Sequence, residues 1–347
     1  MHRSRDVVDF PAWSVGKVRF VSVETPDLRT TRAVRIGQVP LGQDVLPVVI
    51  GGSAAAAGPG GSPGPAQDIR WITLRGHRGR RPAGEAIAEA RAGWASPVLV
   101  EPFSAADLPD IAEQADGVVI GAAWMQDFRL VRAAARLGIP VVVQRGPAAT
   151  LEEWLAIADY CVAEGNDQVA LCECGSRTPM PGGGTTLDLA MAREARARTG
   201  RPVLVALGRD AALAGAAIAA GADGLMLAPD AGRDVVAAAR EAAIVVGAMV
   251  RREDPATVAE ARGVIDRVDA ALATLLERRA ELAGVVQRLK PVGGFAGRDM
   301  ERERSLVAAM ARRAPALGTD RLAPVMNAVI EAGLHLAEER RARPDGG

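Results

Sequence analysis

The stretch PATVAEARGVIDRVDAALATLLERRAELAGVVQRLK, residues 255–290, decides how the C-terminal part of this chain folds. Apolar or small side chains recur in it in alternating steps of four and three residues. Those positions are Ala261, Ile265, Val268, Leu272, Leu275, Leu282, Val286 and Leu289. This spacing is typical of an amphipathic α-helix that buries one seam against other helices. We therefore expect one long helix here, packed along that seam.

One position of the seam holds Arg279. A cation in an apolar seam must be paired or must bind an anion, because an unpaired buried charge is costly. Lys290 follows eleven residues later, close to three helical turns, and so returns to the same face. The two cations suggest an anionic ligand. The alternative is that Arg279 extends from the edge of the seam into solvent, or pairs with a carboxylate such as Glu277 or Glu281.

Length and composition limit the class of protein. The chain has 347 residues, enough for roughly two domains, and its 42 acidic residues balance 42 basic ones. This balance provides no basic field for nucleic acid, and no apolar run matches a signal core or a membrane span. Three cysteines are too few for a disulfide framework. We expect a cytoplasmic protein with no nucleic-acid partner and no membrane partner.

Short apolar runs alternate with Ala- and Leu-rich segments between residues 46 and 250. The eight runs are LPVVI (46–50), RWITL (70–74), PVLVE (97–101), GVVIG (117–121), PVVVQ (140–144), QVALCE (168–173), PVLVA (202–206) and DGLML (223–227). Continuous apolar runs of this length suit strands buried on both faces of a parallel sheet. Eight such strands with helices between them predict an α/β fold, the (β/α)8 TIM barrel.

The predicted barrel of residues 46–250 has a short segment before it and a loop within it. Residues 1–45 contain the β-like runs KVRFVSVE and RAVRIGQV, which we interpret as lead-in strands that cap the barrel. The segment 51–67 is rich in Gly, Pro and Ala, a composition that predicts a mobile loop.

The C-terminal domain, residues 251–347, is predicted to be helical. Its helices are expected near 255–290, 298–313 and 319–342. Asp254 followed by Pro255 is a suitable N-cap and first-turn pair for the first of them. The whole architecture is therefore a TIM barrel followed by an all-α three-helix domain.

Polar residues that follow the strands of such a barrel line its active face. Here they are Arg75, Glu101, Gln144, Arg145, Glu173, Cys174, Arg177, Arg209 and Asp210. The barrel also carries the patterns T-x-E-E-W, A-E-G-N-D-x-V and C-E-x-G-x-R-T, at residues 150–154, 163–169 and 172–178. With these patterns, residues 97–228 resemble the class I, short type Iβ-like, metal-dependent 3-deoxy-7-phosphoheptulonate (DAHP) synthases. The resemblance implies condensation of phosphoenolpyruvate with erythrose 4-phosphate.

Departures from that family bear on the barrel's activity. The lysine that binds phosphoenolpyruvate in the family is replaced by Gln144, and an anion-binding arginine by Cys174. The family's metal ligands have no counterparts at 51–54, at 206–210 or around Ala228. We therefore expect no metal, no cofactor and no DAHP synthase activity. The residues that could still bind a small phosphate or carboxylate, or are relics of the fold, are Arg75, Arg145, Glu173 and Arg177.

The C-terminal domain carries a second resemblance. ARGVIDRVDAALATLLERRAELAGVVQRLK, GRDMERERSLVAAM and VIEAGLHLAEER resemble the all-helical chorismate mutase domain over residues 255–342. The resemblance implies that the catalytic residues are Arg262, Arg279, Lys290, Asp299, Arg302 and Glu303. It further implies a homodimer formed through the long helix, in which Arg262 reaches into the site of the partner subunit.

The chemistry of chorismate agrees with these residue types. Chorismate is a dicarboxylate that rearranges intramolecularly to prephenate, so the reaction needs no nucleophile, metal or cofactor. Catalysis requires a compact conformer and stabilisation of the separating charge. Arginines and a lysine suit the two carboxylates and the ether oxygen, and Glu303 could accept a hydrogen bond from the substrate hydroxyl.

The third helix departs from the mutase family. Ala337 replaces a glutamine that donates to the ether oxygen, and Gly333 replaces a serine one turn earlier; Glu338 is adjacent but one residue out of register. We expect a chorismate mutase of the shikimate pathway. One alternative is a pseudoenzyme that binds aromatic-pathway metabolites and regulates or scaffolds an active DAHP synthase or another shikimate enzyme. Another is a barrel with altered, metal-free aldolase-type activity.

Overall fold

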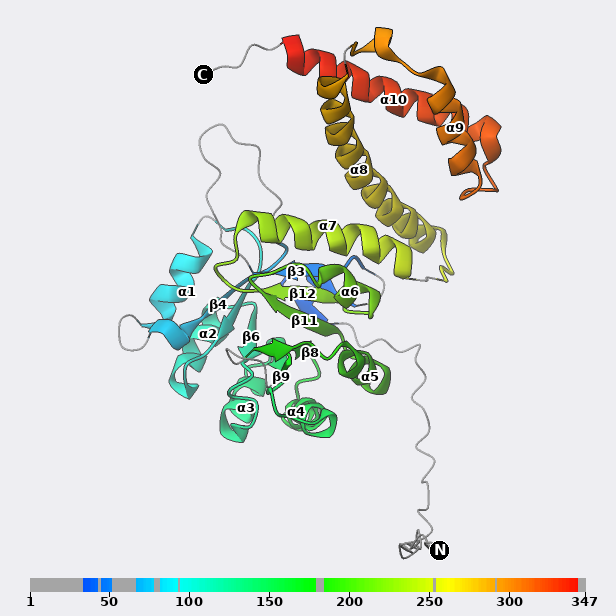
Figure 1. Cartoon of the computed structure of the whole chain (residues 1–347). Coiled ribbons are helices and arrows are strands. Elements are labelled where there is room, and N and C mark those ends of the chain that lie inside the picture. Colours follow the sequence, from blue (N-terminus) through cyan, green and yellow to red (C-terminus); the bar gives the residue numbers. More distant parts are fainter. Residues whose placement is uncertain are drawn as a thin grey trace, which may run out of the picture.

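An eight-stranded parallel sheet organises the N-terminal two thirds of the chain (Figure 1). The structure, a computed structural model, describes residues 34–42, 45–51, 67–77, 82–92, 94–178, 184–251, 254–290 and 292–342. The strands are β3 (Val48–Ile50), β4 (Arg70–Thr73), β5 (Val98–Glu101), β6 (Gly117–Ile120), β7 (Val141–Gln144), β8 (Val169–Glu173), β11 (Val203–Gly208) and β12 (Gly224–Leu227). Each coincides with one of the eight predicted runs to within two residues. The predicted loop at 51–67 lies mostly outside the described residues.

The sheet closes on itself. Its strand order is β3-β12-β11-β8-β7-β6-β5-β4, and every neighbouring pair is parallel. A parallel bridge between Ile50 and Ile69 joins the two ends, and the Gly51 amide donates to the Ile69 carbonyl at 2.9 Å. The predicted (β/α)8 barrel is confirmed. All residues of β5, β6, β8 and β12 are buried, as strands covered on both faces must be.

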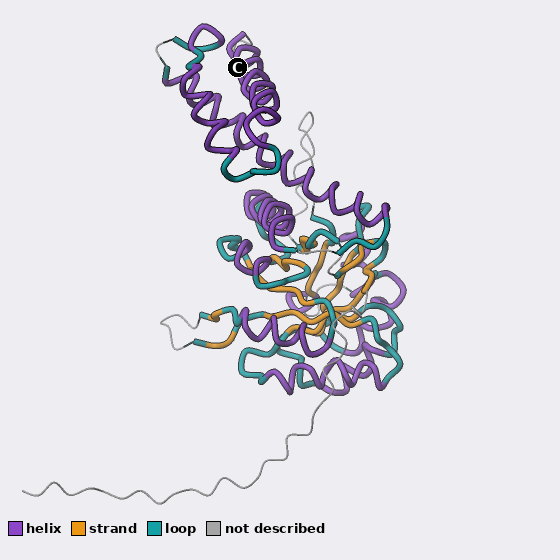
Figure 2. Tube along the Cα trace, turned by 90° about the vertical axis from the view of Figure 1, so that its right-hand side faces the viewer, coloured by secondary structure: helices purple, strands orange, loops and turns teal. Residues whose placement is uncertain are grey.

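Helices surround the sheet (Figure 2). They are α1 (Ala83–Arg91), α2 (Leu108–Gln114), α3 (Phe128–Ala135), α4 (Leu151–Ala163), α5 (Leu189–Thr199), α6 (Ala214–Ala219) and α7 (Arg233–Val250). One apolar layer lies between helices and strands, and a second fills the barrel interior. Trp154 of α4 belongs to the outer layer, is fully buried, and donates from its indole nitrogen to the Val143 carbonyl of β7.

A short hairpin covers the N-terminal end of the barrel. Its strands β1 (Val34–Ile36) and β2 (Val39–Leu41) pair antiparallel, and their apolar side chains join the interior layer. The prediction of a single strand over residues 32–39 was wrong, because Gly37 adopts a φ of 56° and turns the chain back. The other predicted lead-in run, residues 17–24, lies outside the described residues.

Three α-helices follow the barrel, as predicted: α8 (Val258–Leu289), α9 (Met300–Ala311) and α10 (Gly318–Ala342). The first begins later than its predicted N-cap at Asp254. A capping box sets the start instead: Thr257 Oγ1 accepts from the Glu260 amide at 3.2 Å, and the Glu260 carboxylate accepts from the Thr257 amide at 3.1 Å. None of the described helices combines the length and apolar content of a membrane span.

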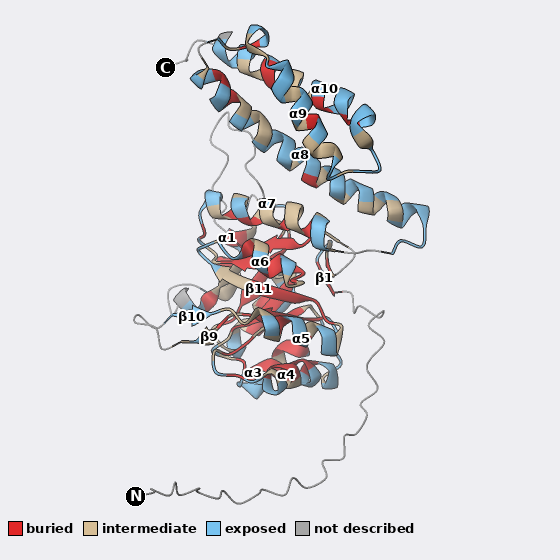
Figure 3. Ribbon diagram, turned by 45° about the vertical axis from the view of Figure 1, so that its right-hand side comes forward, coloured by how far each residue is buried: buried red, intermediate tan, exposed pale blue. Residues whose placement is uncertain are grey.

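The apolar seam of α8 is not buried within one chain, contrary to the expectation from its period. Ile265, Val268, Leu272 and Leu275 are between 42 and 57% exposed, because α9 and α10 pack mainly against the C-terminal part of α8 (Figure 3). The residues of α8 that are buried are Ala271, Gly284 and Gln287. A long exposed apolar face of this kind needs a covering surface.

Candidate active site

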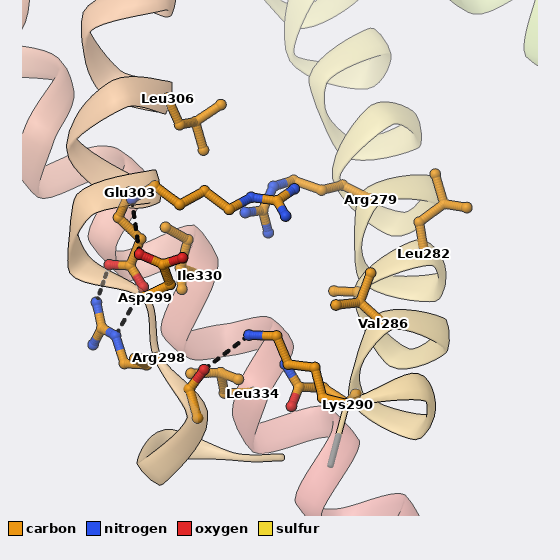
Figure 4. A pocket seen from close by; sticks show the side chains of 14 residues that line it. Arg279, Leu282, Val286, Lys290, Arg298, Asp299, Glu303, Leu306, Ile330 and Leu334 are labelled. Atoms are coloured by element: carbon orange, nitrogen blue, oxygen red, sulfur yellow. Dashed lines mark hydrogen bonds and ion pairs between the residues drawn. The ribbon is translucent and has the colours of Figure 1, made fainter. Parts of the chain in front are cut away.

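A cavity of about 310 Å³ lies among the three C-terminal helices (Figure 4). Its walls are formed by Arg279, Leu282, Ala283, Val286, Gln287 and Lys290 of α8 and its C-cap, by Gly297, Arg298, Asp299, Arg302, Glu303 and Leu306 of the α9 region, and by Ile330 and Leu334 of α10. The volume lies at the lower end of the range for small-molecule sites. The cavity therefore combines an apolar lining with a group of charged side chains.

The two cations of α8 reach into this cavity, as their spacing predicts. Arg279 Nη1 donates to the Val329 carbonyl at 3.3 Å, and Lys290 Nζ donates to the Gly297 carbonyl at 2.8 Å. Glu281 does not take Arg279 as a partner, because it accepts from Arg278 at 2.9 Å on the outer surface of the helix. Neutral carbonyls leave the charges of Arg279 and Lys290 available to an anion.

The start of α9 brings Asp299, Arg302 and Glu303 to the opposite wall. Asp299 is the N-cap, and its carboxylate accepts from the Glu301 and Arg302 amides at 3.2 and 3.0 Å. This capping satisfies two of the free backbone N–H groups of the first turn. It also fixes the rotation of the helix, so that Arg302 and Glu303 both line the cavity.

Arg298 ties the Glu303 carboxylate in place, a contact that sequence reasoning missed. Its Nε and Nη2 donate to the two carboxylate oxygens at 3.1 and 2.6 Å, and Nη1 donates to Glu331 of α10 at 3.2 Å. The hydrogen bonds to Glu303 raise the pKa of Arg298, which keeps the guanidinium charged. Glu303 is paired with Arg298, and Asp299 is engaged in the cap. The cavity therefore carries excess positive charge, which comes from Arg279, Lys290 and Arg302.

The third helix presents little polar surface here. A Cβ on Gly333 would lie 3.6 Å from Ala283 Cβ and 3.9 Å from Arg279 Nη1, so this position lies beside two residues that line the cavity and has room for a small side chain. Neither Ala337 nor Glu338 is among the cavity's lining residues. Glu338 lies instead against the loop before α9, since a Cβ on Gly294 would be 2.6 Å from its Oε1.

Arg262 is the one predicted mutase residue that the structure does not bring to the cavity. It is exposed on the N-terminal part of α8, seventeen residues before Arg279. At 1.5 Å per residue this separation is about 25 Å along the helix axis. Within one chain Arg262 therefore cannot reach the ligand that Arg279 would bind.

In the barrel, Arg145 and Glu173 form a buried pair whose side chains are 1% and 0% exposed. The guanidinium donates to Glu173 Oε2 at 2.5 Å and Oε1 at 2.8 Å, to Ser176 at 3.0 Å, and to the carbonyls of Gly146 and Ala149 at 3.2 and 3.1 Å. An arginine has five N–H donors, so all of them are occupied. In this arrangement Arg145 has no donor left for a phosphate.

The other two barrel candidates lie nearer the surface. Arg75 is exposed, approaches the Glu101 carboxylate to 3.6 Å, and stacks over the Trp124 ring at 5.5 Å. Burial raises the pKa of Glu101, against the lowering effects of Thr73 and Arg75. Arg177 is exposed in the short strand β9 (Ser176–Arg177), which pairs with β10 (Thr185–Thr186). The structure does not gather these arginines around Arg145.

The described residues that follow β11 and β12 do not gather ligands for a divalent metal. Arg209 follows β11, where DAHP synthases have a histidine ligand, and its guanidinium donates to Asp230 at 2.6 Å. Ala228 follows β12 and has no ligating side chain. Within the described residues, no three His, Cys, Asp or Glu side chains converge as a metal site requires.

Comparison with known proteins agrees with both parts of this architecture. Residues 73–229 match the DAHP synthetase I family, and residues 261–338 match chorismate mutase type II. The phospho-2-dehydro-3-deoxyheptonate aldolase of Thermotoga maritima is 35% identical over 150 residues, which cover 41% of this chain and 44% of that protein. The chain thus matches less than half the length of this curated relative.

Two solved structures resemble the barrel. The crystal structure of the Thermotoga maritima phospho-2-dehydro-3-deoxyheptonate aldolase (DAHP synthase) has a TM-score of 0.53 and 25% identity, covering 62% of this chain and 74% of its own. A truncated form of the 3-deoxy-D-arabino-heptulosonate 7-phosphate synthase of Thermotoga maritima has a TM-score of 0.51 and 24% identity, covering 62% and 93%. The chain therefore carries a barrel region that matches the DAHP synthetase I family, followed by a helical region that matches chorismate mutase type II.

Proposed function

We propose that the C-terminal domain converts chorismate to prephenate. The observation that carries this proposal is the cavity in which Arg279, Lys290 and Arg302 meet from two helices while the nearby carboxylates are engaged by Arg298 and by the α9 cap. Such a site combines positive charge that attracts a small dianion with apolar walls that confine it. An intramolecular rearrangement of a dicarboxylate requires that combination.

The rearrangement breaks a C–O bond and forms a C–C bond in one step, with no proton transferred. Arg279 and Arg302 would pair with the carboxylates and hold the side chain over the ring. Lys290 would stabilise the ether oxygen, which becomes negative as its bond to the ring lengthens. Glu303, fixed by Arg298, would accept a hydrogen bond from the ring hydroxyl. The apolar walls exclude water and strengthen these charge interactions.

The experiment compares two adjacent arginines. Arg279→Ala removes a cavity cation, whereas Arg278→Ala removes a neighbour that is bound to Glu281 outside the cavity. Prephenate formation is followed by NMR. Arg279→Ala is expected to lose on the order of a hundredfold or more in kcat/KM, and Arg278→Ala to stay within about twofold of wild type. Equal losses in both variants would show that the cavity is not the site.

We propose further that α8 pairs with α8 of a second copy, and that Arg262 of the partner subunit completes each site. The exposed seam from Ile265 to Leu275 supports this proposal, as does the distance of Arg262 from its own cavity. A twofold dimer applies one face to itself, which suits a single long apolar helix.

Mixing two inactive variants tests the shared site. In a dimer of one Arg262→Ala chain and one Arg279→Ala chain, one site carries both substitutions and the other carries neither. After subunit exchange, half of the dimers are mixed, so about a quarter of the wild-type activity returns. No recovery, with exchange verified by native mass spectrometry, would refute the shared site, because the loss in Arg262→Ala would then arise within its own chain.

For the barrel, residues 46–250, we propose a role without aldol condensation, separated from the helical domain near residue 251. The proposal is supported by the fully occupied donors of Arg145 and by the absence of metal-type ligands at Arg209 and Ala228. Incubation with phosphoenolpyruvate and erythrose 4-phosphate, with and without a divalent metal, tests it. Formation of DAHP would refute it.

A second candidate function follows from the apolar positions Gly333 and Ala337. These positions lack the polar side chains that chorismate mutases carry there. In this second function the domain would bind an aromatic-pathway metabolite and regulate an active DAHP synthase or another shikimate enzyme. Saturable binding of chorismate or prephenate with no turnover would favour this function over the mutase.

A further inference from the structure

Bond cleavage in the proposed mutase reaction places negative charge on the ether oxygen. One ammonium group satisfies only part of the hydrogen-bonding capacity of this oxygen. An oxygen of this kind accepts at least two hydrogen bonds. Lys290 is one donor, and Ala337 supplies none. We propose, on the basis of the mutase function, that Gln287 is a catalytic residue whose side-chain amide donates the second hydrogen bond to the ether oxygen.

Gln287 is placed for this role by its position on α8. It lies three residues before Lys290, almost one helical turn, so both side chains project from neighbouring positions of the same face. Both line the cavity. Gln287 is only 8% exposed, although α8 is exposed along most of its length. A glutamine held at this depth must be ordered by specific contacts.

The orientation of the amide follows from its partner. Gln287 Oε1 accepts from the Gly294 amide at 2.8 Å. Because a backbone N–H can only donate, the oxygen of the side chain must face Gly294 and the NH₂ group must face away from it. In the described part of the chain this NH₂ makes no hydrogen bond, and it is not sealed from solvent. Its two hydrogens are therefore available to a ligand in the cavity.

The surroundings hold this amide rigidly. The Gln287 carbonyl accepts from Arg341 of α10 at 2.5 Å, and Lys290 is bound to Gly297 in the same loop that carries Gly294. The carboxylate of Glu338 lies against the other side of Gly294, where a Cβ would approach it to 2.6 Å. A donor fixed before the substrate binds costs little reorganisation during the reaction.

The same contacts place the amide next to the segment of α10 that carries Glu338. Gly294 touches both Gln287 and Glu338, and Glu338 directly follows Ala337. Glu338 itself is exposed, does not line the cavity, and as a carboxylate can only accept. The Gln287 amide would thus supply from the first helix the donor that Ala337 lacks on the third.

Two substitutions separate the donor role of Gln287 from its structural role. Gln287→Glu keeps an acceptor for the Gly294 amide but has no donor when ionised. Gln287→Leu removes both functions. With chorismate as the probe, we expect kcat to fall on the order of a hundredfold in either variant at neutral pH, with a much smaller change in KM. In Gln287→Glu alone, kcat should rise as the pH falls toward the carboxyl range, because the protonated acid regains a donor.

A rescue completes the test. Adding Ala337→Gln to Gln287→Leu supplies an amide from α10 and should restore part of the lost kcat. The inference is overturned if Gln287→Glu, folded by circular dichroism, keeps wild-type kcat while Arg279→Ala is impaired. It is also overturned if the loss in Gln287→Glu is independent of pH and Ala337→Gln restores nothing. Failure of the mutase proposal is a different result, the absence of turnover in the wild-type protein.

Discussion

Replacing Arg145 with methionine tests whether the buried pair with Glu173 stabilises the barrel or is available to a ligand. The side chains are 1% and 0% exposed, and the guanidinium makes five hydrogen bonds. Methionine fills a similar volume but leaves the Glu173 carboxylate without its counter-ion. The amides of Gly175 and Asp188 still donate to that carboxylate, so part of its stabilisation persists.

Breaking a buried pair by removing one partner costs about 3–5 kcal/mol. For a domain of roughly 200 residues, 1 kcal/mol lowers the unfolding temperature by about 2–4 °C. Arg145→Met should therefore unfold about 6–20 °C below wild type. Because the helical domain is separate from this pair, the mutase activity of the folded variant should be unchanged at low temperature.

Tryptophan fluorescence can follow unfolding of the barrel without a signal from the helical domain. The chain's five tryptophans are Trp13, Trp71, Trp94, Trp124 and Trp154, all before residue 251. Arg209→Met is the matched control, because its partner Asp230 is 63% exposed and such pairs contribute about 1 kcal/mol or less. If Arg145→Met unfolded at the wild-type temperature, the pair would carry no stability and our assignment of Arg145 to the fold would be refuted.

Iodoacetamide at pH 8 should modify half-buried Cys174 first, because Cys161 and Cys172 are buried and burial raises the pKa of Cys161 to about 11. Peptide mass spectrometry measures the labelling, and equal labelling of all three cysteines would contradict this prediction. Glu101→Gln should raise the barrel's unfolding temperature at pH 7. Since the raised pKa of Glu101 makes its ionisation oppose folding, this gain should fade as the pH falls from that raised pKa to 4.5, and a gain independent of pH would refute the cause. Leu275→Glu should shift the protein from dimer to monomer in light scattering, because a charge would lie in the proposed interface; an unchanged mass would move the interface elsewhere.

The sequence predicted those parts of the fold that depend on local pattern. Eight apolar runs became eight strands because residues buried on both faces of a parallel sheet must be apolar without interruption. The hairpin at 34–41 was missed because one glycine turn divides what reads as a single strand. The seam of α8 was read correctly as apolar, but its burial depends on a second surface that the sequence of one chain does not specify.

The candidate site was predictable where spacing along one helix decides it. Arg279 and Lys290 return to one face by helical geometry. Asp299, Arg302 and Glu303 were expected only from the resemblance to chorismate mutases, because no spacing rule identifies them. Contacts between distant segments were not predictable. Arg145 finds Glu173 across 28 residues, and Arg298 reaches Glu331 across 33. Gln287 escaped attention because a count of apolar seam positions passes over a glutamine.

Catalytic turnover of chorismate by the wild-type protein is the most direct test of the central claim. A fixed amount of purified full-length chain is incubated with a large excess of chorismate, and prephenate is quantified by NMR against a sample without protein. A cavity that holds the dianion with Arg279, Lys290 and Arg302 predicts many prephenate molecules formed per site, at a rate proportional to protein concentration. Saturable binding of chorismate with prephenate no faster than in the protein-free sample would contradict the mutase assignment and leave a binding domain.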